Sequence, residues 1–451
     1  MIHRYKSNGY NIVIDVNSGS VHVVDEAAYE AIGMYKEKPA EGIAAYLKEK
    51  FGISESDINE LFSDIETLKE NGTLFSDDIY KEMAPYLKNR HSVIKALCLL
   101  VAQDCNMACE YCFASEGEYH QGSRTLMSFE TGKKALDFLV ENSGTRKNLE
   151  VDFFGGEPLM NWEVVKQLVN YARSIEEEKG KNFRFTITTN GILLNEEIME
   201  FINKEMYNVV LSIDGRPEVN DRLRHTRNGG GTYDIILPKF KKAADSRNQK
   251  DYYLRGTYTH YNTDFTNDIL HLADLGFKQL SMEPVVAPAD APYALTEEDL
   301  PKLLEQYEIL AKEMLKRKDF TFYHYMIDLT GGPCIYKRVS GCGVGTEYMA
   351  VTPSGDLYPC HQFVGDEEYK LGNVFEGITA EEKRDEFKNC NIYAHKECDE
   401  CFARFYCSGG CVANAYHSTG SIKGVYEYGC QLHRKRIECA IMMKAAENDN
   451  P

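Results

Sequence analysis

The chain has 451 residues, 43% of them apolar and 27% charged, which is the composition of a globular protein and excludes a disordered one. The length is enough for two or three domains. A formal net charge of −19 argues against a nucleic-acid backbone or an anionic membrane as the main partner. Apolar runs such as Ile94–Ala102 are too short to cross a bilayer, and the first residues lack a signal-peptide pattern. We therefore expect a cytoplasmic protein.

The first 90 residues predict a small module. Two β-prone runs, Tyr10–Val16 and Val21–Val24, predict a hairpin. A helix follows, with Ser54 at its start and Gly72 at its end. Its apolar face consists of Ile58, Leu61, Phe62, Ile65 and Leu68.

Hairpin and helices together indicate a winged-helix-like module. With 10 Lys and Arg against 16 Asp and Glu in residues 1–90, DNA is an unsuitable ligand. We expect the module to recognise a peptide that adds a strand to the exposed hairpin edge. The alternative is an N-terminal extension that only stabilises the fold.

From residue 91 to residue 310, β-prone runs alternate with helical runs, which predicts βα units and a parallel sheet. The six expected strands are 95–101, 149–154, 183–189, 207–213, 252–259 and 278–283. The expected helices include Ser128–Asn142, Trp162–Lys179, Tyr233–Asp245, Thr266–Leu275 and the bridging helix Glu298–Lys316. The fold class is therefore α/β, with a partial, TIM-like (β/α)6 barrel whose chemistry lies at the C-terminal ends of its strands. A bridging region, 311–332, precedes a last domain at 333–451.

Fourteen cysteines distinguish this chain from an ordinary cytosolic protein. The reducing cytosol disfavours a disulfide framework. Ten of the fourteen follow Pro333, in a glycine-rich stretch that has few periodic segments and needs more than hydrophobic burial to hold it together. The cysteines therefore predict bound metal or clusters.

Cys105, Cys109 and Cys112 follow the first expected strand. Three thiolates hold an iron–sulfur cubane and leave one iron without a protein ligand. A closed zinc site needs a fourth ligand, for which His120 is the candidate in this loop. The spacing, with Tyr111 before the third cysteine, resembles the signature of the radical S-adenosylmethionine (radical SAM) enzymes. The resemblance implies that the open iron binds the amino and carboxylate groups of S-adenosyl-L-methionine.

Residues at the other strand ends agree with this resemblance. Gly155, Gly156 and Glu157 look like the family's GGEP segment, whose backbone and Glu meet the methionine amino group; glycine also permits close approach to a ligand. By similarity, further contacts with the cofactor come from Tyr111, Thr189, Asn190, Ser212 and Arg255. Arg255 is the expected bidentate partner of the methionine carboxylate. The family's reaction makes a 5′-deoxyadenosyl radical that removes a hydrogen atom from an unactivated carbon.

The remaining cysteine pattern resembles the SPASM domain, which holds auxiliary iron–sulfur clusters beside a radical SAM barrel. The resemblance implies a distal cluster held by Cys398, Cys401, Cys407 and Cys430. It implies a proximal cluster held by Cys342, Cys360 and Cys411, with Cys334 as the candidate fourth ligand. Three [4Fe–4S] clusters are then expected in all. Two zinc ribbons are the alternative.

The order of module, barrel and SPASM domain is similar to that of maturases that act on six-cysteines-in-forty-five-residues precursor peptides. These enzymes link a cysteine sulfur to a carbon of another residue. The implied partners are a precursor peptide, whose leader binds residues 1–90, and a reductant such as flavodoxin or ferredoxin. An anaerobic sulfatase maturase, which forms formylglycine, is the rival enzyme; it uses an Asp base beside the proximal set, where this chain has His361. A non-catalytic metal-binding adaptor is the rival of another class.

Overall fold

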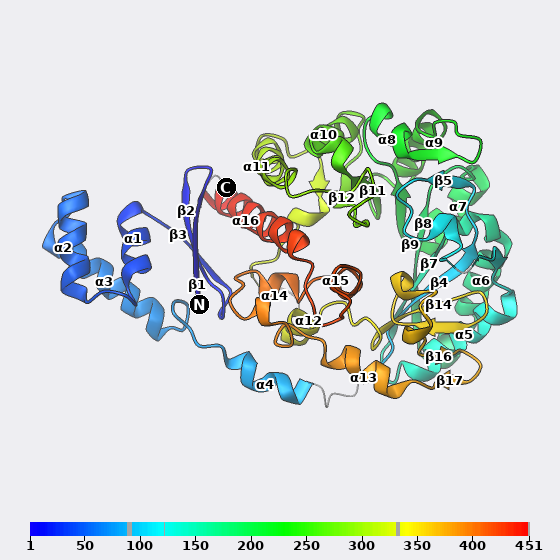
Figure 1. The fold of residues 1–451 in the computed structure, drawn as a ribbon, viewed down its shortest axis with the longest axis horizontal. Helices are drawn as coiled ribbons and strands as arrows, with labels where there is room; N and C mark the ends of the chain where they lie inside the picture. Colours follow the sequence, from blue (N-terminus) through cyan, green and yellow to red (C-terminus); the bar gives the residue numbers. More distant parts are fainter. Residues whose placement is uncertain (88–92, 121, 331–333, 450–451) are drawn as a thin grey trace.

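The computed structural model describes residues 1–87, 93–120, 122–330 and 334–449 (Figure 1). The domain boundaries expected at 90/91 and 332/333 lie outside the described residues, and they stay predictions. The boundary expected at 310/311 falls inside helix α11, Leu300–Lys316. Among the helices that the structure describes, none combines the length and apolarity needed to span a bilayer.

The N-terminal module forms one end of an elongated molecule (Figure 1). It is a sheet of three antiparallel strands in the order β1-β2-β3, where the sequence predicted a two-stranded hairpin. The strands are β1, Ile2–Ser7; β2, Tyr10–Asp15; and β3, Ser20–Val24. Strand β1 was missed because its residues, IHRYKS, are mostly polar and half-buried, so they lack the apolar alternation of a typical strand.

Four helices follow this sheet. They are α1, Glu26–Met34; α2, Ala40–Phe51; α3, Glu55–Glu70; and α4, Ile79–Leu87. The Ser54 side chain accepts a hydrogen bond from the backbone N–H of Asp57 and caps α3, as the sequence predicted. Ile58 and Ile65 of α3 pack with Ile43 and Leu47 of α2 in a small core that belongs to the module.

The barrel contains the six predicted strands, in sequence order and parallel, each within two residues of its expected bounds. They are β4, Ala96–Gln103; β7, Asn148–Gly155; β8, Asn182–Thr189; β9, Met206–Ser212; β11, Tyr252–Tyr258; and β12, Gln279–Pro284. The helices between them are α5, Phe129–Asn142; α6, Trp162–Lys179; α7, Glu196–Glu205; α8, Pro217–Leu223; α9, Tyr233–Ser246; and α10, Phe265–Asp274. Along β7 and β8, fully buried residues alternate with half-buried ones. One face of these strands therefore packs under the helices, and the other faces a partly open interior.

Strands from later in the chain extend this sheet beyond the six that the sequence predicted. Strand β13, Thr321–Phe322, pairs in parallel with β12. At the opposite edge β14, Tyr348–Val351, pairs in parallel with β4 and continues into short antiparallel strands. These are β15, Asp356–Tyr358; β16, Gly372–Asn373; and β17, Gly377–Ile378. The pairing covers the edge of β4, a strand buried along its whole length whose unpaired N–H and C=O groups would otherwise lack partners.

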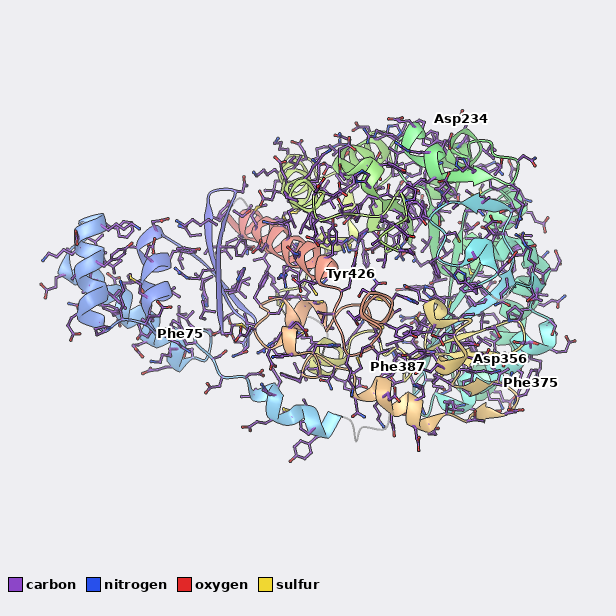
Figure 2. All side chains as sticks on the ribbon, in the orientation of Figure 1. Phe75, Asp234, Asp356, Phe375, Phe387 and Tyr426 are labelled. Atoms are coloured by element: carbon purple, nitrogen blue, oxygen red, sulfur yellow. The ribbon has the colours of Figure 1, made fainter. Side chains whose placement is uncertain are left out.

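The C-terminal part contacts both the N-terminal sheet and the barrel sheet. Its helices are α12, Ile335–Ser340; α13, Glu381–Asn389; α14, Arg404–Cys407; α15, Val412–Thr419; and α16, Glu427–Asp449. Helix α16 lies between the N-terminal sheet and α11 (Figure 1). Phe387 of α13 is buried with its ring edge-on to Phe363, at 5.5 Å between centroids, in the core of this part (Figure 2). The N-terminal sheet is thus packed against α16 of the C-terminal part.

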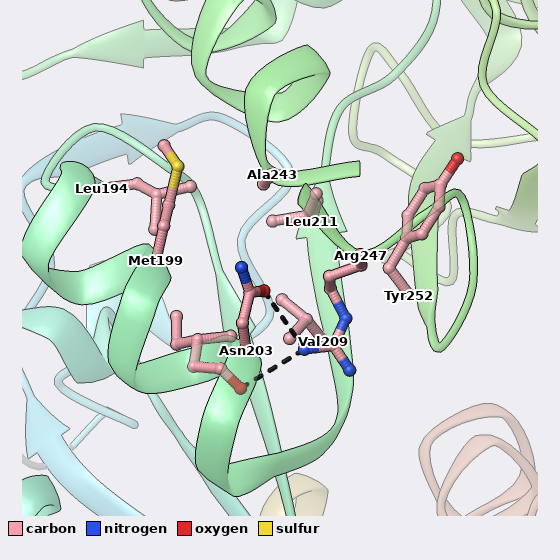
Figure 3. Close-up of a pocket in the computed structure, with 9 residues that line it drawn as sticks. Leu194, Met199, Asn203, Val209, Leu211, Ala243, Arg247 and Tyr252 are labelled. Atoms are coloured by element: carbon pink, nitrogen blue, oxygen red, sulfur yellow. Dashed lines mark hydrogen bonds between the residues drawn. The ribbon is translucent and has the colours of Figure 1, made fainter. Parts of the chain in front are cut away.

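A small void of about 10 Å³ lies outside the barrel among α7, β9 and α9 (Figure 3). Arg247, at the end of α9, donates to the carbonyl of Ile202 at 3.3 Å and to Oδ1 of Asn203 at 3.5 Å. A second nitrogen of Arg247 donates to the carbonyl of Met206 at 3.1 Å. The carbonyl of Ile202 also accepts from the backbone N–H of Met206, so Arg247 adds a second donor there and links the end of α9 to the junction of α7 and β9. The void is about the size of one water molecule, so it is a packing defect and not a ligand site.

Candidate functional site

A cavity of about 160 Å³, called here the first cavity, opens at the C-terminal ends of the barrel strands. It brings together the three cysteines that follow β4 with the residues predicted at the ends of β7, β8 and β9. Its lining includes Cys105, Cys109, Tyr111, Cys112, Phe113, Phe154, Gly155, Gly156, Thr189, Asn190, Ser212 and Arg224. Predicted site residues from four separate strand ends therefore share one cavity.

The cysteine loop is held by backbone pairing and by two arginines. Strand β5, Met107–Cys109, pairs with β10, Arg224–Thr226. Arg227 donates to the carbonyl of Cys105 at 2.7 Å and to Oδ1 of Asp104 at 2.9 Å. Arg124 donates to the same Asp104 oxygen at 2.8 Å. Two cations thus neutralise Asp104 next to the loop and fix the direction of its backbone.

The three cysteines are half-buried, and two of their thiols have raised pKa values. Burial raises the pKa of Cys105 to about 12 and that of Cys109 to about 11, although the Arg224 charge opposes the second shift. Thiols of this kind are protonated at neutral pH unless a metal displaces the proton, since metals bind the thiolate. His120, the alternative zinc ligand, is exposed and hydrogen-bonds to Ser115 Oγ and the carbonyl of Phe113. The sulfur donor set therefore fits an iron–sulfur cluster with three protein ligands.

A buried triad beside Cys109 is the main feature that sequence reasoning missed. The Tyr111 hydroxyl donates to Oδ2 of Asp214 at 2.6 Å and accepts from Nη1 of Arg224 at 2.9 Å. Nη2 of Arg224 donates to the carbonyl of Ser212 at 3.0 Å. Arg224 is 6% exposed, and among the described residues its Nε has no hydrogen-bond partner. A buried guanidinium nitrogen without a partner on the wall of the first cavity fits a ligand that carries a carboxylate.

Arg255 lies outside the set of described residues that line the first cavity. It is on β11, beside Ser212 in the strand register, but its side chain is 56% exposed and its Nη2 lies 3.8 Å from Oε1 of Glu283. Arg224 escaped notice in the sequence because it follows a short helix and not a barrel strand. The order of the strands predicted which loops meet, but not which arginine enters the cavity.

The two glycines after β7 are required by backbone packing. A Cβ at Gly155 would lie 2.2 Å from the carbonyl oxygen of Ala102, and a Cβ at Gly156 would lie 2.3 Å from that of Asp104. Gly155 also has a φ of +127°, which other residues rarely adopt. These glycines are therefore explained by the close contact of β7 with the end of β4, in addition to the approach of a ligand.

Glu157 faces the protein and holds the next strand end in place. It is fully buried, accepting from Thr189 Oγ1 at 2.8 Å, from the backbone N–H of Asn190 at 2.8 Å and from that of Leu159 at 3.0 Å. Asn190 in turn places its Nδ2 3.6 Å from the Cys105 sulfur. The predicted contact of Glu157 with the methionine amino group stays a prediction, and the observed bonds give this side chain a positioning role.

Burial raises the pKa of Glu157 to about 7, even though its three donors favour the carboxylate. The pKa of Glu157 is higher in the folded protein than in the unfolded chain, so the protonated carboxyl contributes its full stabilisation of the fold below about pH 4.5. This contribution is lost as the pH rises through about 7. We expect the stability advantage of the wild type over Glu157→Gln to fall by about 3 kcal/mol between pH 5 and pH 8. Paired urea titrations of the two proteins at both pH values measure this difference. An advantage that stays constant or grows with pH contradicts it.

The distal set, Cys398, Cys401, Cys407 and Cys430, lines a single cavity. Burial raises the pKa of Cys398 to about 12 and that of Cys407 to about 12, and in both cases the neighbouring cysteines of the set add to the effect. Four sulfurs placed around one cavity fit a fully ligated cluster.

The proximal set, Cys342, Cys360 and Cys411, also lies together. Burial raises the pKa of Cys360, and Cys411 and Cys342 contribute to the shift. Cys334 is exposed at the start of α12, directly after residues outside the described ranges, so its role as fourth ligand stays a prediction. Cys390, which belongs to neither auxiliary set, is buried nearby and donates to the carbonyl of Ile422 at 3.0 Å.

Within residues 1–87, 93–120, 122–330 and 334–449, no three His, Cys, Asp or Glu side chains converge closely enough to hold a single metal ion. Iron, sulfide and zinc analysis of the purified protein distinguishes clusters from the zinc alternative.

Family models match two parts of the chain. The model of the radical SAM superfamily matches residues 99–273, which contain the first cavity. The SPASM model, an iron–sulfur cluster-binding domain, matches residues 342–402, from the first cysteine of the proximal set through two cysteines of the distal set.

Relatives extend over most of the chain. The serine-type anaerobic sulfatase-maturating enzyme of Bacteroides thetaiotaomicron is 25% identical over 390 residues, covering 76% of this chain and 90% of that enzyme. The structure of native anSMEcpe with bound AdoMet covers 79% of this chain and 100% of its own, with a TM-score of 0.66 and 21% identity. Streptococcus suis SuiB bound to the precursor peptide SuiA covers 94% of this chain and 97% of its own, with a TM-score of 0.54 and 18% identity. The protein is therefore a radical SAM enzyme, with a barrel of that superfamily followed by a SPASM domain.

Proposed function

We propose that the enzyme is a maturase that forms a thioether between a cysteine sulfur and a carbon of another residue in a ribosomally made, cysteine-rich peptide. One observation carries the proposal: the residue after Cys360 of the proximal set packs against two side chains that line the first cavity. His361 directly follows Cys360, and its ring centroid lies 4.9 Å from that of Phe154 and 5.5 Å from that of Phe113. Both phenylalanines line the first cavity. A substrate carbon in this cavity is therefore near a second cysteine-lined site.

Bound S-adenosylmethionine and clusters supply a 5′-deoxyadenosyl radical and an acceptor for one electron. In the overall reaction a C–H and an S–H bond break and a C–S bond forms. One electron leaves with the abstracted hydrogen atom, the second goes to the acceptor, and the thiol proton goes to a base. Burial, together with the Arg255 charge, lowers the pKa of His361 to about 4, so its imidazole is neutral at pH 7 and a weak acceptor for that proton. The chain's own residues position the carbon and exclude water.

The first cavity also has the groups that S-adenosylmethionine requires. Three thiols hold a cluster with one open iron, Asn190 lies against one of these sulfurs, and Arg224 presents a buried guanidinium. We assign to Arg224 the contact with the methionine carboxylate that the sequence had suggested for Arg255.

The N-terminal module is assigned the recognition of the leader segment. Strand β3 is the outer strand of its sheet and pairs with β2 alone among the described strands, so its other edge is open to an added strand. Val23 on β3 is 47% exposed. The alignment with SuiB leaves 6% of this chain uncovered. Residues 1–87 of the module make up a much larger share of the 451 residues, so the shared fold extends into the module.

We expect Val23→Asp to weaken binding of the leader peptide at least about tenfold, because the substitution places a charge where the ligand strand has to pack. Fluorescence anisotropy of a labelled leader measures the dissociation constant. Tyr207→Asp, at a 58% exposed position at the start of β9, is the matched control and should leave affinity unchanged. If wild type and Val23→Asp bind the leader peptide with equal affinity, the open edge of β3 is not its binding site.

Formylglycine formation is the second candidate, and the similarity to a sulfatase-maturating enzyme favours it. Mass spectrometry separates the two reactions. Anaerobic incubation with a reductant and the cysteine-rich precursor should remove two hydrogens per thioether, keep every sulfur and leave one thiol fewer that can be alkylated. Formylglycine made from cysteine loses the sulfur, and formylglycine made from serine loses two hydrogens but leaves every thiol free for alkylation. A peptide product that has lost sulfur, or that has lost two hydrogens with all its thiols still free, contradicts the thioether assignment.

The distal set offers a further test. Cys398→Ala should retain formation of 5′-deoxyadenosine within about threefold and reduce the crosslinked peptide by about 100-fold or more, because the first cavity is unchanged while an electron acceptor is lost. Chromatography of the nucleoside and mass spectrometry of the peptide are read on the same sample. If Cys398→Ala loses 5′-deoxyadenosine and the crosslinked peptide to the same extent, while its iron content falls by a single cluster, the distal cluster is not limited to the crosslinking step and the assignment is wrong.

A further inference from the structure

Arg404 joins the N-terminal module to the cavity of the distal set. It lies on α14 between Cys401 and Cys407, is 5% exposed and lines that cavity. Its Nη2 donates to Oδ1 of Asn17 at 2.7 Å and to Oδ2 of Asp78 at 2.9 Å, and both acceptors belong to the module. The same guanidinium thus contacts the module and borders the sulfur ligands.

The guanidinium also holds the cysteine segment itself. Nη1 of Arg404 donates at 2.8 Å to the carbonyl of Asp399, which lies between Cys398 and Cys401. Among the described residues, Nε of Arg404 is buried without a hydrogen-bond partner. A buried donor without a partner beside four thiolates fits an anionic group in the cavity.

The rest of the module surface covers the same short segment. The ring of His3 stacks on that of Phe402 at 3.6 Å, and the ring of Tyr80 lies edge-on to that of Phe405 at 5.6 Å. The hydroxyl of Tyr393 donates to the other oxygen of Asp78 at 3.0 Å. Residues 402–405, which connect two cysteines of the distal set, are therefore the surface on which the module is docked.

We infer that Arg404 couples docking of the N-terminal module to the electrostatics of the distal cluster. A cluster bound by four thiolates is anionic, and it becomes more so on reduction, so a buried cation beside it favours the reduced state. Asp78 and Asn17 draw the guanidinium toward the module, and the Asp78 charge opposes that of Arg404. A change in the module that moves Asp78 thus alters the reduction potential of the cluster, and loss of the cluster weakens the docking of the module. Arg404 is a positioning residue in this role.

Substitutions with opposite charge effects test the coupling in the full-length, cluster-loaded protein. Potentiometric titration followed by electron paramagnetic resonance gives the reduction potential of the distal cluster. Arg404→Gln should lower this potential relative to Arg404→Lys, because both variants lose the forked contact with the module and only the first loses the charge. Asp78→Asn, which removes the opposing charge, should raise the potential above that of the wild type. Shifts of the same sign in Arg404→Gln and Asp78→Asn, or no shifts, overturn the inference.

Docking is measured separately by hydrogen–deuterium exchange in residues 1–5 and 76–80. Both Arg404 variants and Asp78→Asn should increase exchange there about tenfold. Arg434→Gln is the matched control: Arg434 lines the same cavity and pairs with Glu427 of its own helix, so its loss should lower the potential and leave exchange unchanged. Increased exchange in Arg434→Gln, or unchanged exchange in the other variants, overturns the coupling.

The coupling requires a cluster at the distal set, whatever reaction the enzyme catalyses. Iron and sulfide counts on each variant test that requirement independently, and mass spectrometry of the peptide product tests the thioether assignment independently. If Arg404→Gln does not fold, Asp78→Asn and Arg404→Lys still decide the outcome.

Discussion

Replacing Cys105, Cys109 or Cys112 with Ala is expected to reduce formation of 5′-deoxyadenosine at least about 1,000-fold, to the level of the assay background. All three sulfurs line the first cavity, and loss of one leaves two ligands for a cluster that needs three. The predicted effect is larger than that of any auxiliary cysteine, because cleavage of the cofactor depends on this cluster. Chromatography of the nucleoside after anaerobic reduction measures it, with iron and sulfide counts on the same preparation.

Cys439→Ala is the control for this experiment. Cys439 is buried in α16, nine residues after Cys430, but it does not line the cavity of the distal set and matches no cluster pattern. Its replacement should keep both the iron content and the cleavage rate within about twofold while costing about 1 kcal/mol of stability. Cleavage that survives in any of the three first-cavity variants would show that the open-iron site lies elsewhere.

Arg224→Gln is expected to weaken binding of S-adenosylmethionine by about 10- to 100-fold, the value of one charge-assisted contact with a carboxylate. It should also destabilise the protein by about 3–5 kcal/mol, because Asp214, 2% exposed, then keeps a buried charge without its cation. Equilibrium dialysis of the cofactor with cluster-loaded protein gives the affinity. Denaturant titration gives the stability.

Two further variants separate affinity from stability. Asp214→Asn combined with Arg224→Gln removes both buried charges and should recover most of the stability while leaving the affinity low. Arg255→Gln, at the exposed position that the sequence had suggested, should change the affinity less than threefold. If Arg255→Gln weakens binding and Arg224→Gln does not, the assignment of the carboxylate contact is wrong.

Some features follow from local sequence because the physics is local. Alternation of β-prone and helical runs predicted six strands within two residues of their bounds, since each βα unit is defined by its own periodicity. Ser54 was identified as a cap because an N-cap bond spans three residues. The three cysteines after β4 were identified as a set for the same reason, since their spacing of three and two residues lies within one loop.

Other features depended on contacts between distant segments. Pairing of β14 with β4 joins residues about 250 positions apart, and nothing in either segment specifies the partner. The role of Glu157 depends on the end of β8, and the docking of the N-terminal module depends on Arg404, more than 300 residues from Asp78.

By itself, then, the sequence determined the α/β barrel, the three cysteine sets and, through resemblance, the superfamily. The tertiary structure alone decided that Arg224 and not Arg255 lines the first cavity, and that the module is docked beside the distal set. The physical reason is range: hydrophobic periodicity, capping and ligand spacing act over a few residues, whereas the surroundings of a buried charge are assembled from distant segments that meet only on folding.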